Sequence, residues 1–193
     1  MERYLIPVSQ TAIDHGFKIG WKVYQDKQNF RSKWIASASK ELQADVSGFI
    51  AESVICEHTG HLLPQLTTQK IDDYDLLING FKVDVKKVTY SRFSSKTKIT
   101  LNKKQFDRKN KKIDIFLFCN FEGSFTSKSV GAMNIFVPIP TTGQLWLIGW
   151  IKSEDVTRLA KIHIWQDRDG KEIDKGYRLL EKDLRPISEL LEA

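Results

Sequence analysis

Cysteine, long apolar runs and low-complexity segments are scarce in this chain of 193 residues. No run of about 18 apolar residues occurs, so we expect no transmembrane helix. The only thiols are Cys56 and Cys119, which are too few for a disulfide framework and suit a reducing compartment. The first ten residues lack the charged start and long apolar stretch of a signal peptide. We therefore expect a cytoplasmic protein without a membrane segment.

Acidic residues are almost absent from a basic segment that follows residues 74–86. Between positions 92 and 112, Asp107 is the only acid. Clustered cations suggest a polyanionic ligand, because lysine and arginine displace counterions from phosphates. A solvated, charged helix or loop would have the same composition. The candidate nucleic-acid-binding residues are Arg92, Lys96, Lys98, Lys103, Lys104, Arg108, Lys109, Lys111 and Lys112.

The pattern of apolar residues predicts a mixed α/β domain with a central sheet of about five strands flanked by helices. The apolar fraction of 41% is enough for a core. Residues 1–38 are expected to be a helical or irregular appendage, and residues 39–193 a single compact domain. The predicted helices are 39–58, a basic one within 100–111, 154–159 capped by Ser153, and one after Pro186. The predicted strands are 113–120, 133–138, 144–151 and 162–166. A loop is predicted at 121–131 and a turn at 167–170.

The most informative segment is residues 74–86, where Asn79-Gly80 separates two apolar-rich runs. Asn-Gly favours a two-residue hairpin turn of type I′, because both central residues need φ > 0. A tight turn here predicts the facing pairs Ile78–Phe81, Leu77–Lys82, Leu76–Val83 and Asp75–Asp84.

Alternation of side chains divides this hairpin into an apolar face and a charged face. Asp75, Asp84 and Lys86 share the charged face. Two carboxylates directly opposite each other, with Cβ atoms roughly 5 Å apart, repel. A divalent cation removes the conflict, and Mg²⁺ is commonly held by one or two carboxylates with water and substrate phosphate. The pattern therefore indicates a Mg²⁺ site beside Lys86, in which Mn²⁺ would substitute.

A third acid, Glu52, lies at the edge of the predicted helix 39–58 and can reach over a sheet edge. Together these residues resemble the PD-(D/E)xK nuclease superfamily, which has the restriction-endonuclease-like fold. Asp75 resembles the first motif acid, Asp84-Val85-Lys86 the (D/E)xK tripeptide, and Glu52 the acid of an upstream helix. Gln105, on the predicted basic helix, resembles a glutamine that some members carry there.

The resemblance covers roughly residues 45–120, and it departs from the pattern at Tyr74, which stands where the superfamily name has proline. It implies a Mg²⁺-dependent phosphodiesterase acting on DNA, in restriction, repair or mobile-element biology. Superfamily members often act as dimers, so a homodimer is also implied.

The resemblance also assigns roles to individual residues. The carboxylates of Glu52, Asp75 and Asp84, with the Val85 carbonyl, would hold the metal, which polarises the phosphate and lowers the pKa of a bound water. Lys86 would orient that water or stabilise charge on the phosphorane, and Gln105 would help to position the strand.

Each of these residues also has a structural interpretation. The two aspartates would also fit as surface acids neutralised by neighbouring lysines. Glu52 and Gln105 would also fit as solvated helix residues. A cross-strand salt bridge to Asp73 would explain Lys86.

One alternative metal site and two alternative functions stay open. A zinc site could include Cys56, His58, His61 and Cys119, although their spacing departs from common zinc motifs. For the function, the alternatives are a non-catalytic nucleic-acid-binding protein with a degenerate nuclease fold and an RNA nuclease, since phosphate chemistry does not distinguish sugars.

Overall fold

The structure is a computed structural model, and it describes residues 3–29, 38–60, 74–88, 98–109, 112–130 and 135–191. In chain order the elements are β1 (Tyr4–Pro7), α1 (Gln10–Asn29), α2 (Ala38–Thr59), β2 (Leu76–Ile78), β3 (Phe81–Lys87), β4 (Lys98–Asn102), α3 (Lys103–Lys109), β5 (Ile115–Val130), β6 (Ile135–Lys152), α4 (Ser153–Leu159), β7 (Lys161–Gln166), β8 (Glu172–Leu180), the 3₁₀ turn η1 (Glu181–Asp183) and α5 (Ser188–Leu191).

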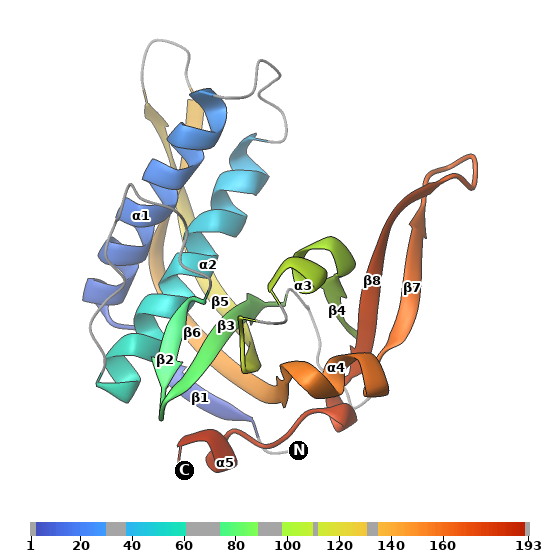
Figure 1. The fold of residues 1–193 in the computed structure, drawn as a ribbon. Coiled ribbons are helices and arrows are strands. Elements are labelled where there is room, and N and C mark those ends of the chain that lie inside the picture. The colour runs from blue at the N-terminus through green and yellow to red at the C-terminus, as the bar shows by residue number, and fades with distance from the viewer. Residues whose placement is uncertain are drawn as a thin grey trace.

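A five-stranded mixed sheet is the centre of the fold, with the strand order β1-β6-β5-β3-β2. β3 and β5 run parallel, and all other neighbours in this sheet are antiparallel. Figure 1 shows α1 and α2 side by side on one face of it. The predicted mixed α/β class with a central sheet of about five strands is confirmed.

A second sheet, with the order β4-β8-β7, was not predicted. Its β7–β8 hairpin, residues 161–180, projects from the body of the molecule, and we call it the arm (Figure 1). The turn predicted at its tip is confirmed. Gly170 has a φ of 79°, and Asp167 Oδ1 accepts hydrogen bonds from the backbone N–H groups of Asp169 and Lys171.

The β2–β3 hairpin has the predicted turn and three of its four predicted pairs, but Asp75 and Asp84 do not form the fourth pair, because Asp75 lies outside the ladder. Asn79 and Gly80 have φ values of 48° and 81°, as a type I′ turn requires. The paired residues are Leu76–Val83, Leu77–Lys82 and Ile78–Phe81. The Asn79 side chain also donates a hydrogen bond of 2.9 Å to the Leu190 carbonyl, which ties the turn to α5.

The two faces of the central sheet are buried against different partners. On one face, Val83 and Val85 of β3 pack in a core with α2. On the other, Phe116 of β5 packs with Phe106 of α3 in a second core, which β4 and β8 complete. The first six residues of β5, 115–120, are buried throughout, as predicted for a strand covered on both faces.

The predicted loop at 121–131 was wrong, because β5 continues to Val130. The strands predicted at 133–138 and 144–151 are likewise one strand, β6, which pairs with β5 along its length. Gly123 and Gly143 make room for the Phe121 ring, since a Cβ on either would lie within 2.5 Å of it. A local sequence rich in Gly, Ser and Lys resembles a loop, and only pairing with a distant strand reveals its extended structure.

The segment before residue 38 supplies one strand of the central sheet, β1, and one helix that helps to cover it, α1. β1 pairs with β6 at one edge of the central sheet. α1 packs closely on α2, because Gly16 and Gly20 have no side chain between the two backbones. A Cβ on Gly16 would lie 2.5 Å from the Ile50 backbone nitrogen, and one on Gly20 would lie 2.7 Å from the Val46 Cα.

Two short predicted helices are present, with starts that differ from the prediction. α3 begins at Lys103, because the preceding residues form β4; Asn102 Oδ1 accepts a hydrogen bond of 3.1 Å from the Gln105 N–H at its start. α4 begins at Ser153, but its N-cap is Lys152, which makes no side-chain cap. The Ser153 N–H instead donates to the Asp114 carbonyl at 2.9 Å.

Candidate active site on strand β3

The edge of β3 that faces β2 carries an aspartate held against the backbone. β2 begins at Leu76, and Asp75, which precedes it, donates its N–H to the Val83 carbonyl at 2.9 Å. Asp75 Oδ2 then accepts a hydrogen bond of 2.8 Å from the Val85 N–H. The N–H and C=O of one residue in a strand point to the same edge. The Val85 carbonyl therefore points to the edge at which the Asp75 carboxylate lies.

The second aspartate, Asp84, lies on the face of β3 that is covered by α3 and β4. Its exposed fraction is 0%, so its interpretation as a surface acid was wrong. The Lys86 ammonium contacts Asp84 Oδ2, and the Lys86 side chain is 27% exposed. Asp84 and Lys86 thus share a face, as alternation predicted. Asp73, the alternative partner of Lys86, lies outside the described residues.

Gln105 is placed beside these two residues by α3. Asp84, Lys86, Gln105 and Asn102 line one small cavity, which Phe106 and Phe116 close from the core side. Its volume is about 10 Å³, which is close to the space that a single water needs. The structure therefore brings Asp84, Lys86 and Gln105 together around a cavity about the size of one water molecule.

Glu52 approaches the same strand from α2. It is half-buried, and its charge acts on the Cys119 thiol of β5, which lies opposite Lys87 of β3. Burial raises the pKa of Cys119 to about 12, with further increases from Glu52 and Asp75. Both carboxylates therefore lie within electrostatic range of the end of β3.

Sequence reasoning missed Lys87, which points to the opposite face from Lys86. Lys87 donates a hydrogen bond to the buried Ser47 hydroxyl of α2. Burial lowers the pKa of this lysine, while Cys119 and Asp45 oppose the shift. Alternation along the segment 84–87 already indicates that consecutive lysines cannot serve one site.

The described residues of the basic segment lie on α3 or close to it in the sequence. Lys104 is exposed on this helix, and Lys103 contacts Asp107 while its ammonium lies 5.6 Å from the centre of the Tyr177 ring. Lys98 and Lys112, which precede and follow α3 in the sequence, are also exposed. Arg108 and Lys109 belong to α3, but their side chains lie outside the description, as do residues Arg92, Lys96 and Lys111 altogether.

Among the described residues, no group of three or more His, Cys, Asp or Glu side chains is placed to hold a metal ion. Of the residues considered for zinc, Cys56 is buried in the core, with its pKa raised to about 12 mainly by burial. His58 is exposed, with its ring 5.3 Å from that of Tyr4. His61 lies outside the described residues.

No protein-family model, no curated protein and no solved structure matches this chain. In the part of the chain that the structure describes, no helix is long and apolar enough to cross a membrane.

Proposed function

We propose that this protein is a Mg²⁺-dependent endonuclease that hydrolyses phosphodiester bonds of DNA, with a restriction-endonuclease-like core. The observation that carries the proposal is the arrangement on β3. Asp75 is bonded to the Val85 N–H, and Asp84, Lys86 and Gln105 line one cavity. The chain order supports it as well: α2 precedes the β2–β3 hairpin, and α3 lies between the parallel strands β3 and β5.

The donor atoms at this strand fit Mg²⁺, which prefers oxygen ligands. The Asp75 carboxylate and the Val85 carbonyl lie at one edge of β3, and Asp84, the residue before Val85, lies on the face that it shares with Lys86. Two carboxylates are sufficient for this ion, since water and substrate phosphate commonly complete its shell. Asp75, Asp84 and the Val85 carbonyl would hold the metal, with Glu52 acting directly or through water. The bound ion would polarise the scissile phosphate and lower the pKa of a water.

The remaining residues position the reactants. The Lys86 ammonium meets the charge of buried Asp84, so a cation is already favoured at this carboxylate. Lys86 can orient an attacking water in the cavity that it shares with Gln105, and it can stabilise charge that develops on the phosphate. The exposed lysines Lys98, Lys104 and Lys112 would bind the nucleic-acid backbone.

One observation favours a second candidate, a nucleic-acid-binding protein without turnover. Asp84 is fully buried beneath Lys86, so metal binding would require that side chain to move. A chain that keeps the basic surface of α3 but never opens this pair would bind DNA and leave it intact.

Cleavage assays with labelled duplex, single-stranded and branched DNA, and with RNA, separate these candidates. We expect product only with Mg²⁺ or Mn²⁺. Asp84→Asn should lower the rate at least about 100-fold while leaving the circular dichroism spectrum unchanged. The matched control is Asp114→Asn, an exposed acid whose Oδ2 accepts a hydrogen bond from the Lys82 N–H. Salt-sensitive binding without product in either metal would support the binding protein, and full activity of Asp84→Asn would refute the proposed site.

A further inference from the structure

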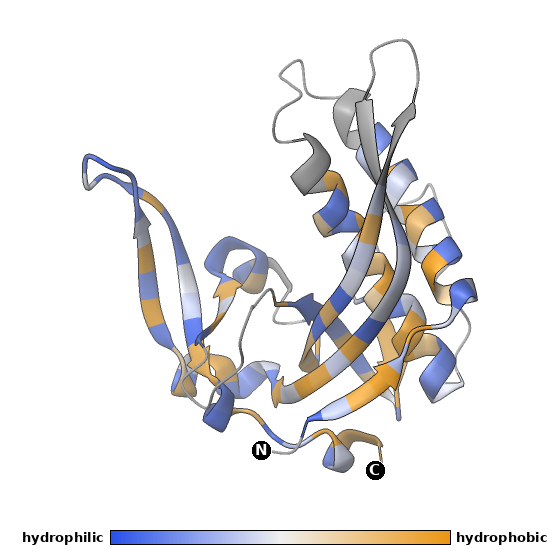
Figure 2. Cartoon of the chain, turned by 180° about the vertical axis from the view of Figure 1, so that it is seen from behind, coloured by the Kyte–Doolittle hydropathy of each residue, from blue (hydrophilic) through white to orange (hydrophobic). Residues whose placement is uncertain are grey.

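The arm exposes a set of large apolar side chains. Ile162 and Ile164 of β7 are 53% and 44% exposed, and Ile173 of β8 is 62% exposed. Figure 2 shows hydrophobic positions along this projecting hairpin. Isolated surface hydrophobes are common, but Ile162 and Ile164 alternate along one strand and so share one face. Neither residue belongs to the two cores of the molecule.

β7 is also an edge strand. In the described residues the second sheet has the order β4-β8-β7, so β7 has a partner on one side only. An edge strand offers a row of backbone N–H and C=O groups to another strand. The register of β7 with β8 is regular from Lys161 to Trp165 and shifts between Trp165 and Gln166. Five consecutive residues of β7 are therefore available in regular geometry.

We propose that β7 pairs antiparallel with β7 of a second copy of this chain, with the two-fold axis at His163. This register uses the five regular residues and no others. It sets Ile162 against the partner's Ile164, and Lys161 against the partner's Trp165. The two three-stranded sheets then form one continuous sheet of six strands.

Side-chain chemistry selects this register over its neighbour. On one face, the two isoleucines of each copy meet those of the partner and lose their exposure to water. On the other face, each Lys161 ammonium can lie over the partner's Trp165 ring. A register centred on Ile164 would set Lys161 against the partner's Asp167, whose Oδ1 already accepts two backbone hydrogen bonds in the arm turn.

The axis position suits His163. Its ring lies 5.0 Å from that of Trp165 in an edge-to-face contact, so it is already packed on the strand. Burial, with Arg178 and Lys98 nearby, lowers the pKa of His163, and two neutral imidazoles can therefore meet at the axis.

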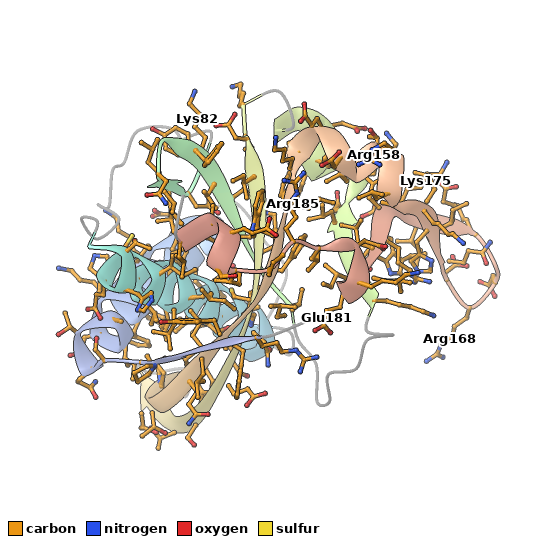
Figure 3. All side chains as sticks on the ribbon, turned by 90° about the horizontal axis from the view of Figure 1, so that it is seen from below. Lys82, Arg158, Arg168, Lys175, Glu181 and Arg185 are labelled. Atoms are coloured by element: carbon orange, nitrogen blue, oxygen red, sulfur yellow. The ribbon has the colours of Figure 1, made fainter. Side chains whose placement is uncertain are left out.

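The pairing is independent of the proposed cleavage chemistry. Figure 3 shows Lys82 of the β2–β3 hairpin at the other end of the molecule from Arg168 and Lys175 of the arm. β7 contributes no residue to the cavity that Asp84, Lys86 and Gln105 line. An interface made by one short strand is small, so we expect a dimer that dissociates on dilution.

Sedimentation velocity over a wide range of concentrations tests the association. The wild type should shift from monomer to dimer, and Ile164→Lys should raise the dissociation constant at least about tenfold. Ile173→Lys is the matched control, because it introduces the same charge at an exposed isoleucine of the arm outside the paired strand. Equal loss in both variants would overturn edge pairing in favour of contact through the apolar face. A wild type that stays monomeric, with DNA binding weakened by Ile164→Lys, would overturn it in favour of nucleic acid on the arm.

Cysteine cross-linking tests the register. Facing residues of antiparallel strands have Cα atoms about 4.5–5.5 Å apart, within the range that a disulfide spans. His163→Cys should therefore form a disulfide-linked dimer on mild oxidation, because the residue faces its own copy. Ile164→Cys should not, because it faces the partner's Ile162. The two native cysteines are buried and do not compete. Linkage by Ile164→Cys alone, or by neither variant, would refute this register.

Discussion

Replacing Lys86 by methionine tests whether Asp84 depends on this one cation. Asp84 is fully buried and its carboxylate contacts the Lys86 ammonium. Removing one partner of a buried pair typically costs about 3–5 kcal/mol, because the remaining charge stays out of water without compensation. For a chain of this size each kcal/mol corresponds to roughly 2–4 °C, so Tm should fall by about 6–20 °C.

The assay is thermal and urea unfolding in EDTA, followed by circular dichroism. Lys87→Met is the matched control, because this neighbouring lysine points to the other face and lies away from Asp84. The double variant Asp84→Asn, Lys86→Met should recover most of the lost stability, since it removes both charges. A loss below about 1 kcal/mol in Lys86→Met would refute the reasoning, because such values are typical of exposed pairs.

Metal addition extends the same experiment. If a divalent cation replaces Lys86 at Asp84, Mg²⁺ should raise the Tm of Lys86→Met, with a gain of about 2.7 kcal/mol when Mg²⁺ is at 100 times its dissociation constant. Asp84→Asn should show no such gain. An equal Mg²⁺ response in Asp84→Asn would place the ion elsewhere.

Three further outcomes are expected. Gly48→Ala should stabilise the protein by about 1 kcal/mol, since Gly48 lies in α2 and nothing lies within 4 Å of the added Cβ. Gly16→Ala should instead cost about 1–3 kcal/mol, because the added Cβ clashes with α2. A urea midpoint that is higher for Gly16→Ala than for Gly48→Ala would contradict both expectations. Burial lowers the pKa of Lys87, so in wild type the unfolded state binds more protons between the folded pKa and 10.5. The gain in unfolding free energy from Lys87→Met should therefore be largest below the folded pKa of Lys87 and shrink as pH rises towards 10.5. A difference between variant and wild type that does not change with pH would contradict the lowered pKa. Cys56 and Cys119, with pKa values of about 12, should resist iodoacetamide until the protein is denatured, and full labelling of the native state would disagree.

Local signals explain which elements the sequence predicts. The hairpin turn at Asn79-Gly80 and the end of α2 at Gly60 depend on backbone conformations with φ > 0, which these residues adopt readily. The alternation of Asp84 and Lys86 with valine gives the face on which they lie, and this needs only the period of a strand.

Elements that depend on distant partners were missed, or predicted only as helical or irregular, for a physical reason. α1 contains Gly16 and Gly20, which are poor helix formers, and its close packing on α2 compensates. β8 mixes polar residues with its buried Tyr177 and Leu179, and residues 122–124 of β5 are exposed, so neither segment shows a clean apolar alternation.

The burial of Asp84 also needs tertiary information. The sequence places this residue beside Lys86, but it does not show that α3 and β4 cover that face of β3. Likewise, the Asp75 carboxylate can accept a hydrogen bond from the Val85 N–H because β2 begins only at Leu76, and the boundaries of a strand are poorly encoded locally.

Anomalous diffraction from a crystal soaked in Mn²⁺ would show whether the edge of β3 binds a divalent cation. We expect one strong peak in contact with the carboxylates of Asp75 and Asp84 and the Val85 carbonyl, with the Lys86 ammonium displaced from Asp84. Full Mn²⁺ occupancy elsewhere, with Lys86 still paired to a buried Asp84, would contradict it.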